Sequence, residues 1–272
     1  MDLCQMGGQL LEQMVSSQGC NATQPVQQGP TISDSHSLEF PHPPSHNILR
    51  NTFVIIPAFN EEQVIRETVQ RVLCLGVQVI VVDDFSTDGT VMVIEDLPIT
   101  ILRHSLNLGQ GAALQTGIDY ALHLKARFLV TFDADGQHDE HDIPMMINTL
   151  INQNLDFVLG SRFLGRAENI STSRFLLLKA AGVFTFMTSG LKLSDVQNGL
   201  RAFSAESAPF IKITQNRMAH ASEILHNIKK HGLRFQEVPT TVRYTEYSQR
   251  KGQTALGAGD IVYELIMRRL FP

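Results

Sequence analysis

The chain has 272 residues, a formal charge of -5, and 43% hydrophobic and 18% charged residues. These are ordinary values for a globular protein that buries a core, and the negative charge gives no electrostatic reason to expect a nucleic-acid partner. The three cysteines, Cys4, Cys20 and Cys74, are too few and too scattered for a disulfide framework or a zinc site. A reducing, cytosolic setting is therefore favoured.

Residues 1–50 differ in composition from the rest of the chain. They contain seven glutamines, five of the eleven prolines and only five charged residues. A segment of this kind buries too little apolar surface to offset the entropy of folding. We therefore predict a mostly disordered tail over residues 1–50 and one folded domain over residues 51–272.

The chain has no run of about twenty apolar residues, the length that a helix needs to cross a bilayer. The nearest candidate, residues 175–193, contains Lys179 and has Lys192 close to its end. Charged residues at these positions favour a buried or interfacial helix instead.

From Thr52 onward, short β-branched runs alternate with longer amphipathic stretches. Ser86 and Asp88, in the turn STDGT, are candidate helix caps. This alternation predicts right-handed crossovers and an α/β fold, with a Rossmann-like, doubly wound, mostly parallel sheet and helices on both faces. Strands are predicted over residues 52–57, 77–84, 99–104, 127–135 and 156–163, and helices over 61–76, 109–126 and 141–152.

Three loops rich in polar residues follow predicted strands. Their sequences are PAFNEE, DDFST and DADGQ. In a parallel sheet of this kind, ligands bind beyond the carboxyl ends of the strands. The three loops are therefore expected to converge on one crevice.

Two carboxylates, Asp133 and Asp135, stand one residue apart at the end of a predicted strand. Side chains at i and i+2 of a strand point to the same side, so both can reach one ion, and oxygen ligands favour a hard cation such as Mg²⁺ or Mn²⁺. In a lone D-x-D pattern, the two aspartates are more often solvent-exposed residues of a turn than ligands of an ion. Here the strand position and the two neighbouring loops favour the ion site. His138 and His141 lack cysteine partners and helical zinc spacing, so solvated histidines are expected there.

Six segments together resemble the inverting family 2 glycosyltransferases, in the branch that contains dolichol-phosphate mannosyltransferase and bacterial polyprenyl-phosphate glycosyltransferases. The segments are VIIPAFNEE, VIVVDDFSTDGT, RHSLNLGQGAALQTGI, VTFDADGQHD, VLGSRF and DVQNGLRAF, and they occur in that order from about Thr52 onward. The resemblance implies a GT-A fold, a nucleotide-diphosphate sugar as donor, and Mg²⁺ or Mn²⁺ as cofactor.

The resemblance also implies roles for individual residues. The D-x-D pair and Gln137 match the metal-side ligands, where the cation offsets charge on the departing diphosphate. The positions that match nucleotide contacts are Pro57, Phe59, Glu61, Asp83, Asp84 and Ala134.

On the acceptor side, Arg162 and Arg174 occupy positions that resemble contacts to the acceptor phosphate, for which guanidinium has suitable geometry. Asp195 and Arg201 bracket the segment DVQNGLRAF, which typically lines the acceptor side of the family's site. An anionic lipid phosphate needs no strong base, whereas a sugar hydroxyl would make Asp195 the candidate general base.

The resemblance predicts transfer to a polyprenyl phosphate, a dolichyl phosphate or a lipid-linked glycan. The alternatives are a soluble transferase acting on a saccharide hydroxyl and an inactive nucleotide-binding module. For the lipid acceptor we expect a cytoplasmic protein in peripheral contact with the cytoplasmic face of a membrane. That contact would involve the helix near Phe175 and an amphipathic helix over residues 259–272. Near the C-terminus, Arg243, Ser248, Arg250 and Lys251 are candidates for closing over the diphosphate.

Overall fold

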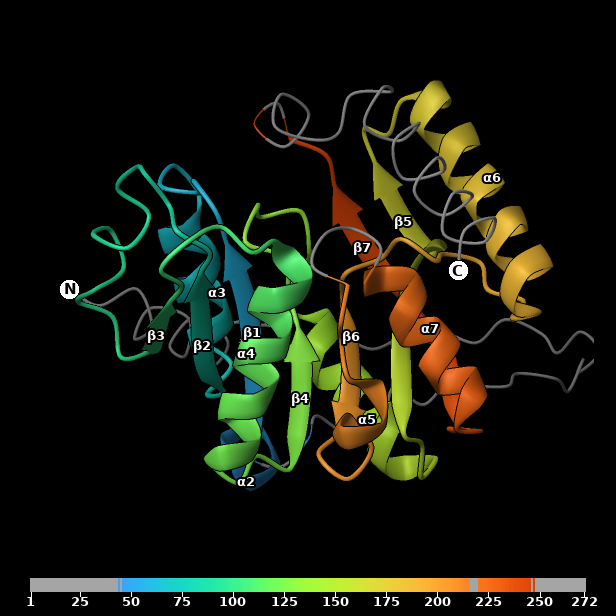
Figure 1. Cartoon of the computed structure of the whole chain (residues 1–272), viewed down its shortest axis with the longest axis horizontal. Coiled ribbons are helices and arrows are strands. Elements are labelled where there is room, and N and C mark those ends of the chain that lie inside the picture. Colours follow the sequence, from blue (N-terminus) through green and yellow to red (C-terminus); the bar gives the residue numbers. More distant parts are fainter. Residues whose placement is uncertain (1–43, 45, 216–219, 246, 248–272) are drawn as a thin grey trace, which may run out of the picture. The chain divides into compact units, whose positions relative to one another are not determined.

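The computed structural model describes residues 44, 46–215, 220–245 and 247 (Figure 1). Within these residues, seven strands form one sheet in the order β3-β2-β1-β4-β6-β5-β7. The strands are β1 (Thr52–Ala58), β2 (Gln78–Asp83), β3 (Thr100–Arg103), β4 (Phe128–Thr131), β5 (Phe157–Glu168), β6 (Arg201–Ser204) and β7 (Phe235–Arg243). The helices are α2 (His46–Arg50), α3 (Ile65–Leu73), α4 (Gln110–His123), α5 (Asp142–Asn152), α6 (Thr172–Ser189), the 3₁₀ helix η1 (Ala208–Ile211) and α7 (His220–Lys230).

The sheet is mostly parallel, as the sequence predicts. Strand β1 pairs in parallel with β2 and β4, β2 pairs in parallel with β3, and β5 pairs in parallel with β7. Strand β6, which was not predicted, lies antiparallel between β4 and β5. With four residues it is too short to give a periodic signal in the sequence.

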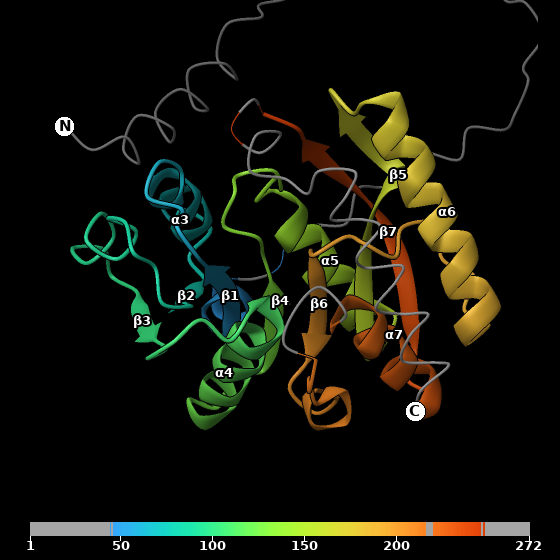
Figure 2. The ribbon, with the colours of Figure 1, turned by 45° about the horizontal axis from the view of Figure 1, so that its top comes forward.

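Helices cover both faces of the sheet, which confirms the predicted α/β architecture (Figures 1 and 2). On one face, Val54 and Ile56 of β1 pack with Val69 of α3 and Met146 of α5. On the other face, helices α4 and α7 pack on the sheet, and Ile55 of β1 belongs to this second cluster. Consecutive residues of β1 thus enter opposite clusters, as expected for a strand buried on both faces.

The helix after β1 begins later than predicted. It starts at Ile65, because the loop before it is bonded to the loop after β2: the Glu61 N–H donates to Thr90 Oγ1 at 2.7 Å and the Glu62 N–H to Asp88 at 3.3 Å. The expectation that Ser86 and Asp88 cap a helix was wrong, because residues 90–96 form a series of turns.

The segment predicted as a tail lies mostly outside the described residues, as does the predicted amphipathic helix over residues 259–272. The described part of the tail segment includes helix α2, whose Ile48 and Leu49 pack against the core. The domain boundary near residue 50 stays a prediction.

Helix α6 contains most of the apolar segment singled out in the sequence. The Ser171 side chain accepts from the Arg174 N–H at its start, and Gly190, with φ 69°, ends it. In the described part of the chain, no helix is long and apolar enough to span a membrane.

Candidate active site

The polar loops meet at one edge of the sheet. Because β1, β2 and β4 are parallel neighbours, the loops after Ala58, Asp83 and Thr131 all open at that edge. Strand β6 runs the opposite way, and Thr131 pairs with Arg201 at its beginning, so the segment before β6 reaches the same edge. The sheet order therefore adds residues 195–200 to the three predicted loops.

The loops after β1 and β2 are bonded to each other. The Asn60 N–H donates to Ser86 Oγ at 2.9 Å, next to the Glu61–Thr90 bond. Asn60 and Phe85 have positive φ values of 54° and 66°. Asparagine tolerates this conformation, but it is costly for phenylalanine, and such strain is typical of functional loops.

Four of the predicted nucleotide contacts lie along this edge. Pro57 is in β1, the Phe59 side chain is exposed, and Ala134 is buried between the two aspartates. Glu61 is buried, and the Tyr247 hydroxyl donates to its carboxylate at 2.7 Å. Their contact with a nucleotide stays a prediction.

Asp83 and Asp84 are both buried, and their carboxylates hold the surrounding loops. Asp84 accepts from the N–H groups of Leu108 at 2.9 Å and Gly109 at 2.6 Å, and its Oδ1 lies 2.8 Å from His104 Nδ1. With both oxygens engaged, Asp84 anchors the loop before α4. A nucleotide contact by either aspartate stays a prediction.

The D-x-D carboxylates follow directly after β4. Asp133 accepts from Gln110 Nε2 at its Oδ1 and lies against His138 Nε2 at its Oδ2, both at 2.9 Å. Asp135 accepts from the Gln137 N–H at 3.1 Å and from Gln137 Nε2 at 2.7 Å. Among the described residues, each of these four carboxylate oxygens has one hydrogen-bond partner, and a carboxylate oxygen can accept from more than one group, as a cation ligand needs.

The surroundings of the two aspartates shift their pKa values in opposite directions. Burial, together with the charge of Asp133, raises the pKa of Asp135 to about 6. Burial alone would raise the pKa of Asp133, but the hydrogen bond and charge of His138, with the charges of His220 and Arg162, lower it. Two crowded carboxylates of this kind are what a divalent cation stabilises, so the donor set fits a hard cation.

His138 is not the solvated histidine that was predicted. Its side chain is 3% exposed, it contacts Phe132 edge to face, and it forms a bridge with Val242. No periodic pattern in the sequence indicates this burial, because it comes from the contact of β7 with the loop. His141 is exposed as expected.

Carboxylates next to the D-x-D loop are engaged in ion pairs. Among the described residues, ligand atoms of Asp139, Glu140 and His141 lie within 4.8 Å of one another. Asp139, however, bonds Arg243 at 2.5 Å, and Arg71 lies 3.5 Å from Glu140. This cluster therefore braces the loop. Arg243 is committed to it, and the other predicted closing residues, Ser248, Arg250 and Lys251, lie outside the described residues.

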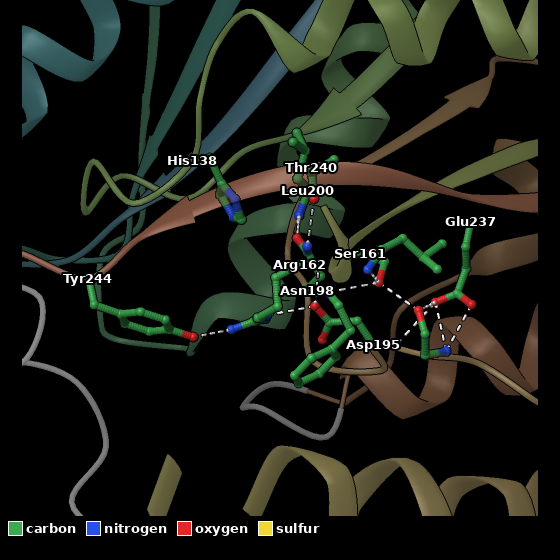
Figure 3. A network of polar contacts seen from close by, with 12 residues as sticks. His138, Ser161, Arg162, Asp195, Asn198, Leu200, Glu237, Thr240 and Tyr244 are labelled. Carbon is green, nitrogen blue, oxygen red and sulfur yellow. Dashed lines mark hydrogen bonds and ion pairs between the residues drawn. The ribbon is translucent and has the colours of Figure 1, made fainter. Parts of the chain in front are cut away.

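Arg162 and Asp195 form a buried ion pair (Figure 3). Asp195 Oδ2 accepts from Arg162 Nε at 2.6 Å and from the Arg162 N–H at 3.0 Å, and Arg162 Nη1 donates to the Tyr244 hydroxyl. Burial alone would lower the pKa of Arg162, but Asp195 and Tyr244 raise it. Asp195 Oδ2 is thus engaged with Arg162, and a role of Asp195 as general base stays a prediction.

A second carboxylate holds the loop that carries Asp195. Glu237 of β7 accepts from the Ser194 N–H at 2.8 Å, from Ser194 Oγ at 2.9 Å and from the Asp195 N–H at 3.1 Å. Ser161 Oγ lies 2.6 Å from Ser194 Oγ (Figure 3). Asp195 is thus fixed through both its side chain and its backbone.

The other two predicted arginines differ in surroundings. Arg174, in the first turn of α6, lies over the Tyr244 ring with 4.7 Å between Cζ and the centroid. Arg201 is buried and donates from Nε to the Asn198 carbonyl at 3.2 Å. Burial lowers its pKa to about 10, against the opposing charges of Asp133 and Asp195.

Residues that the sequence reasoning missed make up much of this site. Gln110 is the first residue of α4. Glu237 belongs to β7, and Tyr244 directly follows β7, next to Arg243, which was singled out only as a candidate for closing over the diphosphate. The one sequence signal for β7 is a polar residue, Glu237, beside a β-branched run. Their roles depend on strand order, which the motifs do not contain.

Comparison with known proteins connects this site with sugar transfer. The model of Glycosyl transferase family 2 matches residues 53–208. An uncharacterized protein of Methanocaldococcus jannaschii is 38% identical over 227 residues, which are 80% of this chain and 92% of that protein. The UDP-N-acetylglucosamine–dolichyl-phosphate N-acetylglucosaminyltransferase of Methanococcus voltae is 32% identical over 240 residues, which are 80% of this chain and 96% of that enzyme.

A solved structure shares the fold. Glucosyl-3-phosphoglycerate synthase from Mycobacterium tuberculosis, in complex with Mn²⁺, UDP-glucose and phosphoglyceric acid, superimposes with a TM-score of 0.62. The match covers 84% of this chain and 82% of that chain, at 16% identity. The likeness shows the fold, and at this identity it shows nothing about substrate.

Proposed function

Because the chain belongs to glycosyl transferase family 2, we propose that it moves a sugar from a nucleotide-diphosphate donor to the phosphate of a polyprenyl or dolichyl lipid. Membership of the family makes it a glycosyltransferase. The lipid acceptor is supported by the name of the Methanococcus voltae relative, which acts on dolichyl phosphate.

One observation carries the proposal. Thr131, just before the D-x-D pair, is paired with Arg201, and a Cβ atom at Gly199 would lie 2.8 Å from Asp133 Cγ, so the segment before β6 lies against the D-x-D loop. Asp195 of this segment holds Arg162, so the carboxylates proposed for the donor side and the arginines proposed for the acceptor side lie at one edge of the sheet. A transferase needs this arrangement, because the departing diphosphate and the attacking phosphate must both lie next to the anomeric carbon.

On the donor side, Asp133, Asp135 and Gln137 are the residues that would hold Mg²⁺ or Mn²⁺. The cation would offset the negative charge that builds on the departing diphosphate. His138 and Gln110 contact Asp133, and the bonded loops after β1 and β2 carry Phe59 and Glu61, which would lie beside the nucleotide.

On the acceptor side, a phosphate oxygen of the lipid attacks the anomeric carbon. The new carbon–oxygen bond forms as the bond to the diphosphate breaks, and the diphosphate leaves with the electron pair, so the configuration inverts. The attacking group is already anionic, so no base is required. Asp195 then serves to hold Arg162, and Arg201 supplies a buried positive charge next to the reacting groups.

The proposal extends to the membrane surface. Helix α6 exposes Leu176, Val183 and Phe186, and Lys179 lies over the Phe163 ring at 3.9 Å. An apolar helix face with a cation beside it is suited to rest on an anionic lipid surface without crossing it. Salt-sensitive sedimentation with anionic liposomes should follow, and no sedimentation with any liposome would remove this part of the proposal.

The donor half is tested by thermal stabilisation. Sugar nucleotides are screened with and without Mn²⁺, for the wild type and for Asp135→Asn. A donor at about one hundred times its dissociation constant should stabilise the wild type by about 2.7 kcal/mol. Asp135→Asn should lose the metal-dependent part of that shift, and stabilisation that ignores both metal and mutation would contradict the proposal.

A further inference from the structure

Tyr244 contacts both arginines that were assigned to the acceptor phosphate. Its hydroxyl accepts from Arg162 Nη1, and its ring lies under the Arg174 guanidinium, 4.7 Å from Cζ. Arg162 comes from β5 and Arg174 from α6, so a single aromatic side chain contacts an arginine of each element. Figure 3 shows the hydrogen bonds that join Tyr244 to Arg162 and Arg162 to Asp195.

Tyr244 is itself firmly placed. It directly follows the last residue of β7, it is 3% exposed, and its N–H donates to the Glu168 carbonyl at 3.1 Å. Its position is therefore set by the backbone of β5 and β7. The contacts with Tyr244 restrict the many rotamers of Arg174 and add to the hold of Asp195 on Arg162.

We propose that Tyr244 is a positioning residue that holds Arg162 and Arg174 in place for the acceptor phosphate; this rests on the proposed function. A buried tyrosine with a bonded hydroxyl is often only part of a core. Here, however, the hydroxyl contacts Arg162 and the ring face contacts Arg174, and both arginines are assigned to the acceptor side. Holding them in advance reduces the rotamer entropy that phosphate binding would otherwise cost.

The two contacts can be separated by substitution. Tyr244→Phe keeps the ring under Arg174 and removes the bond to Arg162, which Asp195 still holds. Tyr244→Leu removes both contacts. We expect the KM for a short polyprenyl phosphate to rise by about fivefold to tenfold in Tyr244→Phe, and further in Tyr244→Leu, as the loss of one and then two contacts to charged groups implies.

The experiment measures KM for donor and acceptor separately, together with the melting temperature. Tyr120→Phe on α4, remote from the acceptor residues, is the matched control and should leave both KM values unchanged. A purely structural role would lower the melting temperature and active fraction without changing the acceptor KM. If Tyr244→Leu folds poorly, Tyr244→Phe decides the question.

A double-mutant cycle adds a direct test of the ring contact. If Tyr244 acts through Arg174, then Arg174→Ala and Tyr244→Leu together should raise the acceptor KM by less than the product of their single effects. An acceptor KM within about twofold of the wild type in both Tyr244 variants, or fully multiplicative effects in the cycle, would overturn the inference. Failure of the wild type to use any polyprenyl phosphate would instead overturn the proposed function.

Discussion

Nε2 of His138 lies 2.9 Å from Oδ2 of Asp133, inside a buried part of the loop. A carboxylate only accepts hydrogen bonds, so the imidazole donates and fixes the orientation of Asp133. Partners of this kind typically change metal affinity by about 10–100-fold. We therefore expect His138→Phe, which keeps the ring contact with Phe132, to weaken Mn²⁺ binding by about that factor.

His138→Gln is the matched variant, because its amide can still donate to Asp133, and it should retain more of the affinity. Isothermal titration of the folded protein with Mn²⁺ in the presence of donor measures both. Equal affinities in the wild type and His138→Phe would show that the bond does not orient a ligand.

Gly199 leaves the space that the Asp133 carboxylate occupies. A Cβ atom at this position would lie 2.8 Å from Asp133 Cγ, which is closer than real contacts allow. Gly199→Ala should therefore displace Asp133 and reduce transfer by at least about tenfold, as expected when a catalytic group moves by about an ångström. Gly232→Ala, at a position with no neighbouring atom within 4 Å, is a control for activity, although its φ of 63° costs some stability. Normal activity in Gly199→Ala would contradict the claim that transfer depends on the position of Asp133.

Removing one partner of the Arg162–Asp195 pair should destabilise the protein far more than removing one partner of an exposed pair. Breaking a buried pair leaves an uncompensated charge, at a typical cost of about 3–5 kcal/mol. Asp195→Asn should destabilise the protein by up to that amount in urea unfolding. Asp96→Asn, which disrupts the exposed pair with Arg66, should change stability little. Equal losses in the free energy of unfolding for Asp195→Asn and Asp96→Asn would contradict this prediction.

The sequence was sufficient for strands β1 to β5 and for the three loops at the edge of the sheet, but not for β6 and β7. Buried strands such as β1 and β2 are continuous apolar runs, and the D-x-D pair follows a third run, so parallel pairing alone brings them together. The antiparallel insertion of β6 was not predictable, because residues 201–204 have no period that fixes a direction. That insertion places Arg201 and Gly199 against the D-x-D loop.

The acceptor side was less predictable for a related reason. Arg162 and Asp195 were identified separately, but their pairing depends on β5 and the segment before β6 meeting across the sheet edge. The contact of Tyr244 with both Arg162 and Arg174 depends on β7 lying beside β5. Motifs report the type of chemistry at a position, whereas burial and partners are set by strand order.

Asp142 should make stability depend on pH. Burial raises its pKa to about 6, although the Thr241 N–H, at 2.8 Å, opposes the shift. A raised carboxyl pKa means that the folded state favours the protonated form, so this contribution to stability is complete below pH 4 and is lost as the pH rises through 6. At pH 7.5 the charged group is therefore a penalty.

Asp142→Asn removes that penalty and can still accept from Thr241. After allowance for solvent screening, it should stabilise the protein by about 1–2 kcal/mol at pH 7.5 and have little effect at pH 4. Asp139, whose pKa is lowered against burial by His141 and Arg243, is the opposite case, and Asp139→Asn should destabilise at pH 7.5. Urea unfolding at the two pH values measures each effect. A pH-independent difference between wild type and Asp142→Asn would contradict the assignment.

Transfer of a labelled sugar from a nucleotide sugar to a short polyprenyl phosphate tests the proposed reaction most directly. The purified wild type is assayed with Mn²⁺ or Mg²⁺ and again with excess chelator, and the anomeric configuration of the product is determined by NMR. We expect a metal-dependent glycosyl phosphate with inverted configuration. Full turnover in chelator, retained configuration, or transfer only to a saccharide hydroxyl would contradict the mechanism proposed for this site.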